Sequence, residues 1–132
     1  MSKEWEALVE EEFCEFCFVK CDISGHSIIL SQHPQKKVIE TLEKFGHYIE
    51  VKVNQYDGRL WTWQGDGGLI AFLGREKTND AIKFSLDIIN NLDSFNNDDS
   101  MIQEDIKLRL AVHLGTANYR EQTGHIHSVD VI

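Results

Sequence analysis

Several features are scarce in this sequence, and each scarcity narrows the class of protein. Proline occurs once and glycine nine times in 132 residues, which leaves little room for a long disordered linker and fits one domain. Positive charge is also scarce, because 13 lysines and arginines face 22 aspartates and glutamates, for a formal net charge of -9. Such a surface repels nucleic acid phosphates, so we expect no nucleic acid partner.

Long apolar runs are missing as well. No window of the sequence reaches the roughly 18 consecutive apolar residues that a membrane helix needs. The acidic N-terminus, MSKEWEALVEEEF, lacks the apolar stretch of a signal peptide. We therefore expect no membrane partner and a cytoplasmic location.

Cysteine is limited to Cys14, Cys17 and Cys21, an odd number within eight residues. In a reducing compartment such residues are thiols rather than disulfides. Cys14 and Cys17 form a C-x-x-C pair, but a zinc site needs four ligands and there is no second cysteine pair. His125 and His127 could share a strand face as further ligands. We favour buried thiols over zinc.

Strand-like and helix-like segments alternate along the chain. Short stretches rich in β-branched, aromatic or alternating apolar residues predict strands, and apolar residues at helical spacing predict helices. The turn SGHS precedes a helix that opens near Pro34, and DSFNNDDSMIQED reads as a polar loop. Gly115 should end the last of the four strands. The expected strands are Phe16–Asp22, Arg59–Trp63, Leu69–Leu73 and Ile106–His113, and the expected helices contain Leu42 and Phe84.

This order, β-α-β-β-α-β followed by the start of another strand, predicts an α+β fold. The expected architecture is a ferredoxin-like split βαβ antiparallel sheet with both helices on one face. We expect residues 1–15 to form a lead-in segment and residues 16–132 to form the domain.

Two aspartates come together in this topology. The third strand runs antiparallel beside the first, so Asp22, at the end of the first strand, faces Asp66, in the glycine-rich turn before the third. Two adjacent carboxylates resist ionising together unless a cation lies between them. Oxygen ligands suit Mg²⁺ or Mn²⁺, which hold substrate phosphates through one or two carboxylates. Taken singly, each aspartate is more simply a turn residue, but their convergence favours a metal site.

Backbone groups near both aspartates could bind phosphate. Gly25, His26 and Ser27 lie between the first strand and the first helix, where backbone N–H groups can receive phosphate oxygens. The turn containing Gly65 can bring backbone close to a ligand.

Three ordered motifs resemble those of class III adenylyl and guanylyl cyclases. VKCDISGHSIIL resembles the first metal motif, DGRLWTWQGDGGLIAF resembles the second with its Gly-Asp-Gly turn, and KLRLAVHLGTA resembles a later strand that ends in His, one residue, Gly. The resemblance covers about residues 16–132.

This resemblance implies the nucleotidyl cyclase fold and a two-metal mechanism. It implies that Asp22 and Asp66, with the Ile23 carbonyl, hold two Mg²⁺ or Mn²⁺ ions, and that Gly25, His26, Ser27 and Gly65 contact phosphates. One ion would activate the ribose 3′-hydroxyl and the other would bind the triphosphate, so that pyrophosphate leaves. The family works as a head-to-tail dimer with shared sites, which implies a homodimer.

The sequence departs from the family at the positions that read the base. Thr62 stands where the family has Lys for adenine or Glu for guanine, and Ile126 would align with the second reader if the family's catalytic Asn followed directly after Ile132. The sequence has neither the adenine code nor the guanine code, so the base that would be cyclised stays open. Pyrimidines, which cyclases of some bacterial anti-phage systems use, are among the candidates. The transition-state Asn and Arg would follow Ile132. We therefore expect these residues to be the front part of the catalytic domain, which alone lacks both groups.

Two alternatives belong to other functional classes. A non-catalytic cyclase-homology module for dimerisation or nucleotide sensing is favoured by the missing base code and opposed by the two aspartates. A ferredoxin-like RNA binder is opposed by the net charge of -9.

Overall fold

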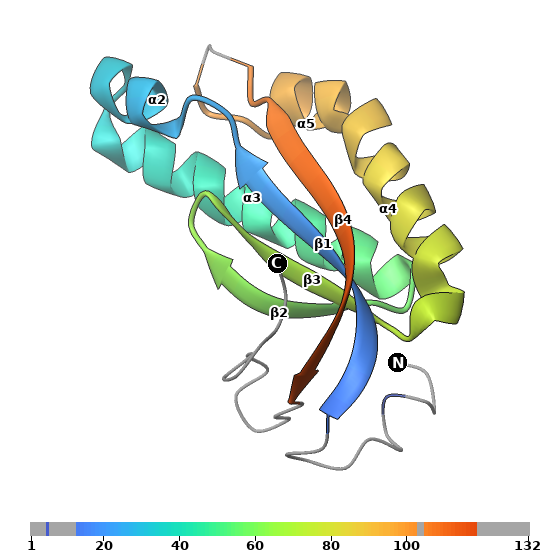
Figure 1. The fold of residues 1–132 in the computed structure, drawn as a ribbon. Coiled ribbons are helices and arrows are strands. Elements are labelled where there is room, and N and C mark those ends of the chain that lie inside the picture. Colours follow the sequence, from blue (N-terminus) through green and yellow to red (C-terminus); the bar gives the residue numbers. More distant parts are fainter. Residues whose placement is uncertain (1–4, 6–12, 103–104, 119–132) are drawn as a thin grey trace.

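The computed structural model describes residue 5, residues 13–102 and residues 105–118 (Figure 1). Within this part, four strands form one antiparallel sheet in the order β2-β3-β1-β4. This is the predicted split βαβ arrangement, in which β1 and β3 are the central strands. The strands are β1 (Phe13–Ile23), β2 (Arg59–Gln64), β3 (Gly67–Leu73) and β4 (Leu108–Asn118).

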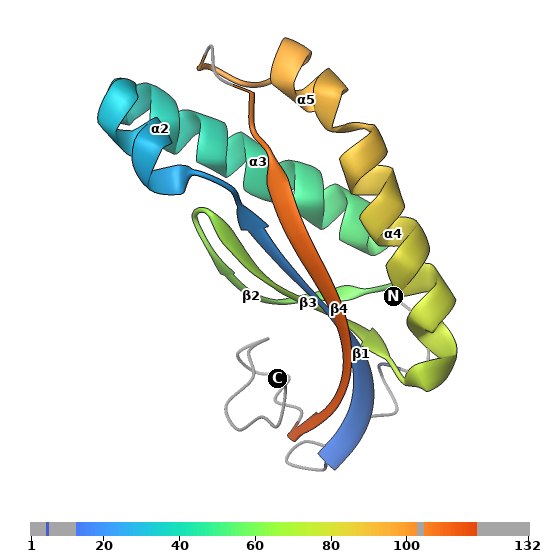
Figure 2. The same ribbon diagram turned by 45° about the horizontal axis from the view of Figure 1, so that its top comes forward.

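The helices lie on one face of the sheet, as predicted (Figures 1 and 2). The longest, α3, begins directly after Pro34, whose missing N–H costs nothing at a helix start. In the described part of the chain no helix is long and apolar enough to cross a membrane. The helices are α2 (His26–Gln32), α3 (Gln35–Gln55), α4 (Thr78–Asn90) and α5 (Leu92–Asp98), with a short 3-10 turn, η1 (Arg75–Lys77).

Three local expectations were wrong. Residues that we expected to be a turn begin a helix, α2, because Gly25 adopts a left-handed φ of 74° and Ile29 is buried. Part of the expected polar loop is the helix α5, which buries Leu92 and Phe95. Gly115 does not end β4, which continues to Asn118 along the edge of β1.

The two faces of the sheet have separate apolar clusters. Odd-numbered residues of β1, from Cys17 to Ile23, point into the core under α3 and α4. Phe16 and Phe18 point to the other face, where they pack with Trp61 and Trp5. We call this second face, away from the helices, the open face. Since side chains alternate along a strand, Lys20 and Asp22 also belong to the open face.

Asp87 joins the helices through a polar network. Its carboxylate accepts a hydrogen bond from the Tyr56 hydroxyl at 2.7 Å and one from Asn91 Nδ2 at 2.7 Å, and it pairs with Lys52 Nζ at 3.1 Å. The hydrogen bond from Tyr56, followed by Lys52 and Asn91, lowers the pKa of Asp87. The network fixes the C-terminal half of α3 against α4.

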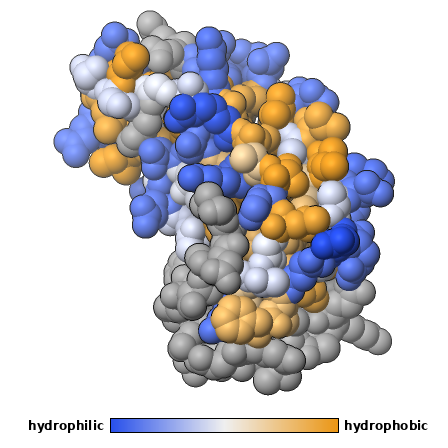
Figure 3. All heavy atoms as spheres, viewed as in Figure 1, coloured by the Kyte–Doolittle hydropathy of each residue, from blue (hydrophilic) through white to orange (hydrophobic). Residues whose placement is uncertain are grey.

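Apolar side chains are also exposed on the helix layer. Figure 3 shows them gathered over α4 and the outer edge of β4. On α4, Ile82, Leu86 and Ile89 recur at helical spacing and are exposed, and on β4 Val112 and Leu114 are exposed. Helix α4 is therefore apolar on a second side, beyond the side that it buries against the sheet.

Candidate metal and nucleotide site

The structure brings Asp22 and Asp66 to the same end of the sheet. Asp22 is the second-last residue of β1 and pairs with Gly67 of β3. Asp66 lies in the turn between β2 and β3, and its backbone carbonyl accepts a hydrogen bond from the Ile23 N–H at 2.8 Å. The backbone of the Asp66 turn is thus hydrogen-bonded to Ile23, the residue directly after Asp22.

Gly67 allows this close approach. A Cβ atom placed on Gly67 would lie 2.5 Å from the carbonyl oxygen of Cys21 and 2.9 Å from Cα of Asp22. Any side chain here would push β3 away from β1 at the point where Asp22 pairs. The glycine of the Gly-Asp-Gly turn therefore has a packing role beside the aspartate, and its neighbour Gly65 takes a positive φ of 44° to make the turn.

Arg109 faces Asp22 from β4. The two residues are directly opposite in the strand register, and Arg109 Nε donates a hydrogen bond to Asp22 Oδ1 at 3.0 Å. A second contact joins its terminal nitrogen to Asp22 Oδ2 at 3.5 Å. The Arg109 side chain is 70% exposed and that of Asp22 is 38% exposed, so the pair lies in solvent contact on the open face.

Sequence reasoning missed Arg109, although a signal for it was present. In the segment IKLRLAVH every second residue is apolar, and Arg109 is one of the residues between them. The strand that contains it neighbours β1. A cation on that strand, beside a candidate metal aspartate, is the pattern that would have identified it.

The three residues after β1 that we expected to contact phosphate lie at the start of α2. Gly25, with its left-handed φ of 74°, precedes α2, and its carbonyl accepts the N–H groups of Ile28 and Ile29. A Cβ at Gly25 would meet no atom within 4 Å, so the backbone conformation and not crowding favours glycine. His26 begins α2, and Ser27 is exposed in its first turn.

Thr62 lies on the open face, and the other expected base-reading residue is not described. Thr62 is directly opposite Leu69, which is in turn directly opposite Lys20, so the three side chains share one face. Ile126 lies outside the described residues, as do His125 and His127. His113 is exposed on β4, opposite Phe18.

Cys17 and Cys21 are free thiols and both are buried. Burial raises the pKa of Cys17 and raises that of Cys21 to about 12. These two thiols therefore stay protonated at neutral pH and pack as apolar side chains.

Asp22 and Asp66 are of the ligand type that a divalent cation takes. Within the described ranges, no three histidine, cysteine, aspartate or glutamate side chains gather as a metal site. Two carboxylates are what Mg²⁺ takes from a protein when substrate phosphates supply the remaining ligands. Asp22 and Asp66 meet that requirement, whereas a structural zinc ion would need four protein ligands.

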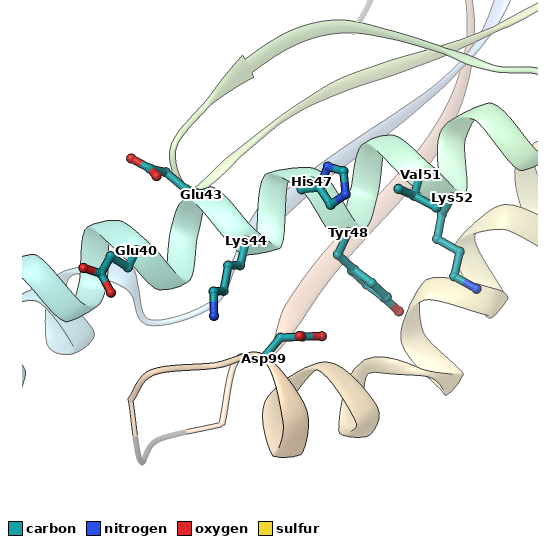
Figure 4. Close-up of a pocket in the computed structure, with 8 residues that line it drawn as sticks. All are labelled: Glu40, Glu43, Lys44, His47, Tyr48, Val51, Lys52 and Asp99. Atoms are coloured by element: carbon teal, nitrogen blue, oxygen red, sulfur yellow. The ribbon is translucent and has the colours of Figure 1, made fainter.

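Asp22 lies on the open face of the sheet, where its side chain is 38% exposed. A groove of about 630 Å³ lies instead on the helix layer, where Lys44, Tyr48 and Lys52 of α3 point toward the side of α5 and Asp99 (Figure 4). Several of its side chains have structural partners, since the Tyr48 hydroxyl donates to the Ile88 carbonyl at 3.0 Å and Lys52 pairs with Asp87. Neither candidate metal aspartate lines this groove.

Comparison with known proteins gives structural likeness without sequence likeness. No protein-family model matches the chain, and no curated protein matches it significantly. The monomeric guanylyl cyclase domain of the RhoGC fusion protein from the aquatic fungus Blastocladiella emersonii is similar, with a TM-score of 0.75, 18% identity and 94% of this chain covered. The catalytic core of a rhodopsin-guanylyl cyclase with converted specificity, in complex with ATPαS, has a TM-score of 0.72, 19% identity and 92% coverage.

A bacterial light-regulated adenylyl cyclase is similar as well, with a TM-score of 0.70, 17% identity and 92% of this chain covered. The chain therefore has the fold of the class III nucleotidyl cyclase catalytic domain. It spans 71%, 66% and 63% of these three solved chains, respectively. At such identities the likeness establishes the fold.

Proposed function

We propose that the chain is the metal-binding part of a nucleotidyl cyclase, which converts a nucleoside triphosphate to a 3′,5′-cyclic nucleotide and pyrophosphate. The observation that carries this proposal is the convergence of Asp22 and Asp66 at one end of the sheet, on the fold of known cyclases. The motif resemblance supports the same two residues. Two bound Mg²⁺ or Mn²⁺ ions would supply activation of the ribose 3′-hydroxyl and neutralisation of the triphosphate.

The chain's own residues would position the substrate. The carboxylates of Asp22 and Asp66, with the Ile23 carbonyl, would hold the ions. The backbone of Gly25, His26, Ser27 and Gly65 would contact phosphate oxygens. Catalysis of phosphoryl transfer depends mainly on such positioning and on charge neutralisation.

Arg109 adds a group that responds to charge at the site. Its guanidinium is bound to Asp22 at 3.0 Å, and a guanidinium is well suited to bind phosphate oxygens. Arg109 would be held less strongly by Asp22 if that carboxylate also held a cation. Its guanidinium would then be available to the triphosphate, which brings a larger negative charge to the same edge.

A homodimer with shared sites fits the position of the aspartates. Asp22 lies on the open face with its side chain 38% exposed, where solvent would reach a bound nucleotide from one side. A second copy placed over this face would close the site and exclude water. The dimer and its cytoplasmic location remain part of the proposal.

The proposal is tested by incubating the protein with each of the four ribonucleoside triphosphates and Mn²⁺, and identifying products by mass spectrometry. Within the 132 residues no asparagine is followed by arginine four positions later. The chain thus lacks the family's pair of transition-state donors. Losing one positioned donor costs roughly a hundredfold or more in rate, so we expect these 132 residues to bind nucleotide without measurable turnover.

Supplying both transition-state donors to this chain should give it turnover. We expect a chimera in which residues 1–132 are followed by the C-terminal part of the Blastocladiella domain to release a cyclic nucleotide. Robust turnover by the 132-residue chain would show that its catalytic residues are elsewhere. A chimera that binds triphosphate with Mn²⁺ but makes no product would favour the alternative, a non-catalytic module for nucleotide sensing.

A further inference from the structure

Lys20 stands in the same transverse row of the open face as Thr62. The strand register gives the row as Thr62 of β2, Leu69 of β3, Lys20 of β1 and Ala111 of β4. Adjacent strands are about 4.8 Å apart, so Thr62 and Lys20 are separated by roughly 10 Å with Leu69 between them. The next row toward the end of β1 contains Gly67, Asp22 and Arg109.

Lys20 lies between apolar neighbours and the candidate metal aspartate on the open face. Its neighbours across the strands are Leu69, which packs against the aromatic cluster, and Ala111, and its neighbours along β1 are the buried Phe18 and Asp22. Lys20 is exposed, and within the described residues its side chain takes part in no hydrogen bond or ion pair. An ammonium group with hydrogen-bond partners in the protein would have a structural role, whereas the ammonium group of Lys20 is available to a ligand.

The row has the form of a platform for a nucleobase. Leu69 offers an apolar floor between Thr62 and Lys20, so one edge of an aromatic base that points toward Leu69 could be contacted by Thr62 from one side and by Lys20 from the other. The ammonium of Lys20 donates hydrogen bonds only, while the Thr62 hydroxyl both donates and accepts. The row contains no carboxylate that would hold an exocyclic amino group.

We propose that Lys20 is a second base-contacting residue and selects bases that carry a ring carbonyl beside a ring N–H. Lys20 would donate to the carbonyl oxygen and the Thr62 hydroxyl would accept from the N–H. Uracil and guanine present this edge, whereas adenine and cytosine present a bare ring nitrogen beside an amino group. This inference rests on the proposed function, because it takes the open face around Thr62 as the place of the base.

The experiment measures equilibrium binding to the protein, with Mn²⁺, of α,β-methylene analogues of UTP, GTP, ATP and CTP, which cannot release pyrophosphate. Inorganic triphosphate is the fifth ligand. The variants are Lys20→Met, Lys20→Arg, and Lys83→Met, which removes an exposed lysine from α4 on the helix layer.

We expect Lys20→Met to weaken binding of the UTP and GTP analogues roughly tenfold to a hundredfold, the range of a hydrogen bond from a charged donor. Binding of inorganic triphosphate should be unchanged, Lys20→Arg should recover most of the loss, and Lys83→Met should match the wild type. An equal loss for inorganic triphosphate would make Lys20 a phosphate contact and overturn the inference. Equal losses for all four analogues, or none, would overturn it too.

These outcomes separate the inference from the proposed function. If the wild type binds all five ligands in a Mn²⁺-dependent way but Lys20→Met changes no base preference, only the role of Lys20 fails. If the wild type binds none of the five, the metal site fails and the role of Lys20 fails with it.

Discussion

Replacing Asp66 by alanine should abolish cation-dependent nucleotide binding and leave the fold intact. The loss should exceed a hundredfold, because removing even the outer partner of a metal ligand costs roughly 10- to 100-fold in metal affinity. The fold should survive because the Asp66 backbone carbonyl, which the substitution keeps, receives the hydrogen bond from the Ile23 N–H at 2.8 Å. Calorimetric titration with a triphosphate, with and without Mn²⁺, measures the effect.

Asp98→Ala is the matched control, because it removes the same charge from an exposed position at the end of α5. It should bind like the wild type. Asp66 is a cleaner target than Asp22, whose removal would also leave Arg109 without its partner. Unchanged affinity of Asp66→Ala in the presence of Mn²⁺ would remove Asp66 from the site.

Replacing Trp5 by alanine should cost about 3–5 kcal/mol of unfolding free energy, the usual range for a buried large aromatic residue. Trp5 is 1% exposed and stacks on Phe16 with ring centroids 5.9 Å apart. Its Nε1 donates to the Asp57 carbonyl at 3.0 Å, and the Arg59 guanidinium lies 4.8 Å from the ring centroid. Domains are stable by only about 5–15 kcal/mol, so the loss would be a large part of the total.

Urea unfolding followed by circular dichroism measures this loss. Trp5→Phe keeps an aromatic ring and loses the hydrogen bond, so it should cost clearly less than Trp5→Ala. If the unfolding free energy of Trp5→Ala is within about 1 kcal/mol of the wild-type value, Trp5 does not contribute to the cluster with Phe16.

The order of strands was predictable because each strand has a short, distinctive pattern. The aromatic and apolar residues of β1, the glycine turn at Asp66 and the alternation in β4 are local signals, and the split βαβ topology follows from their sequence. The same topology predicts Asp22 beside the turn of Asp66. The convergence of the two aspartates is therefore a consequence of the fold, and three short segments of the sequence predict that fold.

The features that were missed depend on contacts between distant residues. Helix α5 has a polar sequence typical of a loop, and it is held by burial of Phe95 and by Asn96, which exchanges hydrogen bonds of 2.7 and 3.1 Å with the backbone of Ile106. Trp5 is isolated in an acidic stretch, and only the sheet shows what it packs against. The pairing of Arg109 with Asp22 required the register of β4 on β1.

The central claim, a shared cation site between Asp22 and Asp66, is tested most directly by anomalous diffraction. Crystals of the protein would be grown with Mn²⁺ and α,β-methylene-UTP, and data collected at the manganese edge. Manganese peaks within bonding distance of a carboxylate oxygen of both Asp22 and Asp66, with phosphate oxygens completing the coordination, are the result that we predict. Triphosphate density whose manganese peaks lie away from both aspartates would contradict the account.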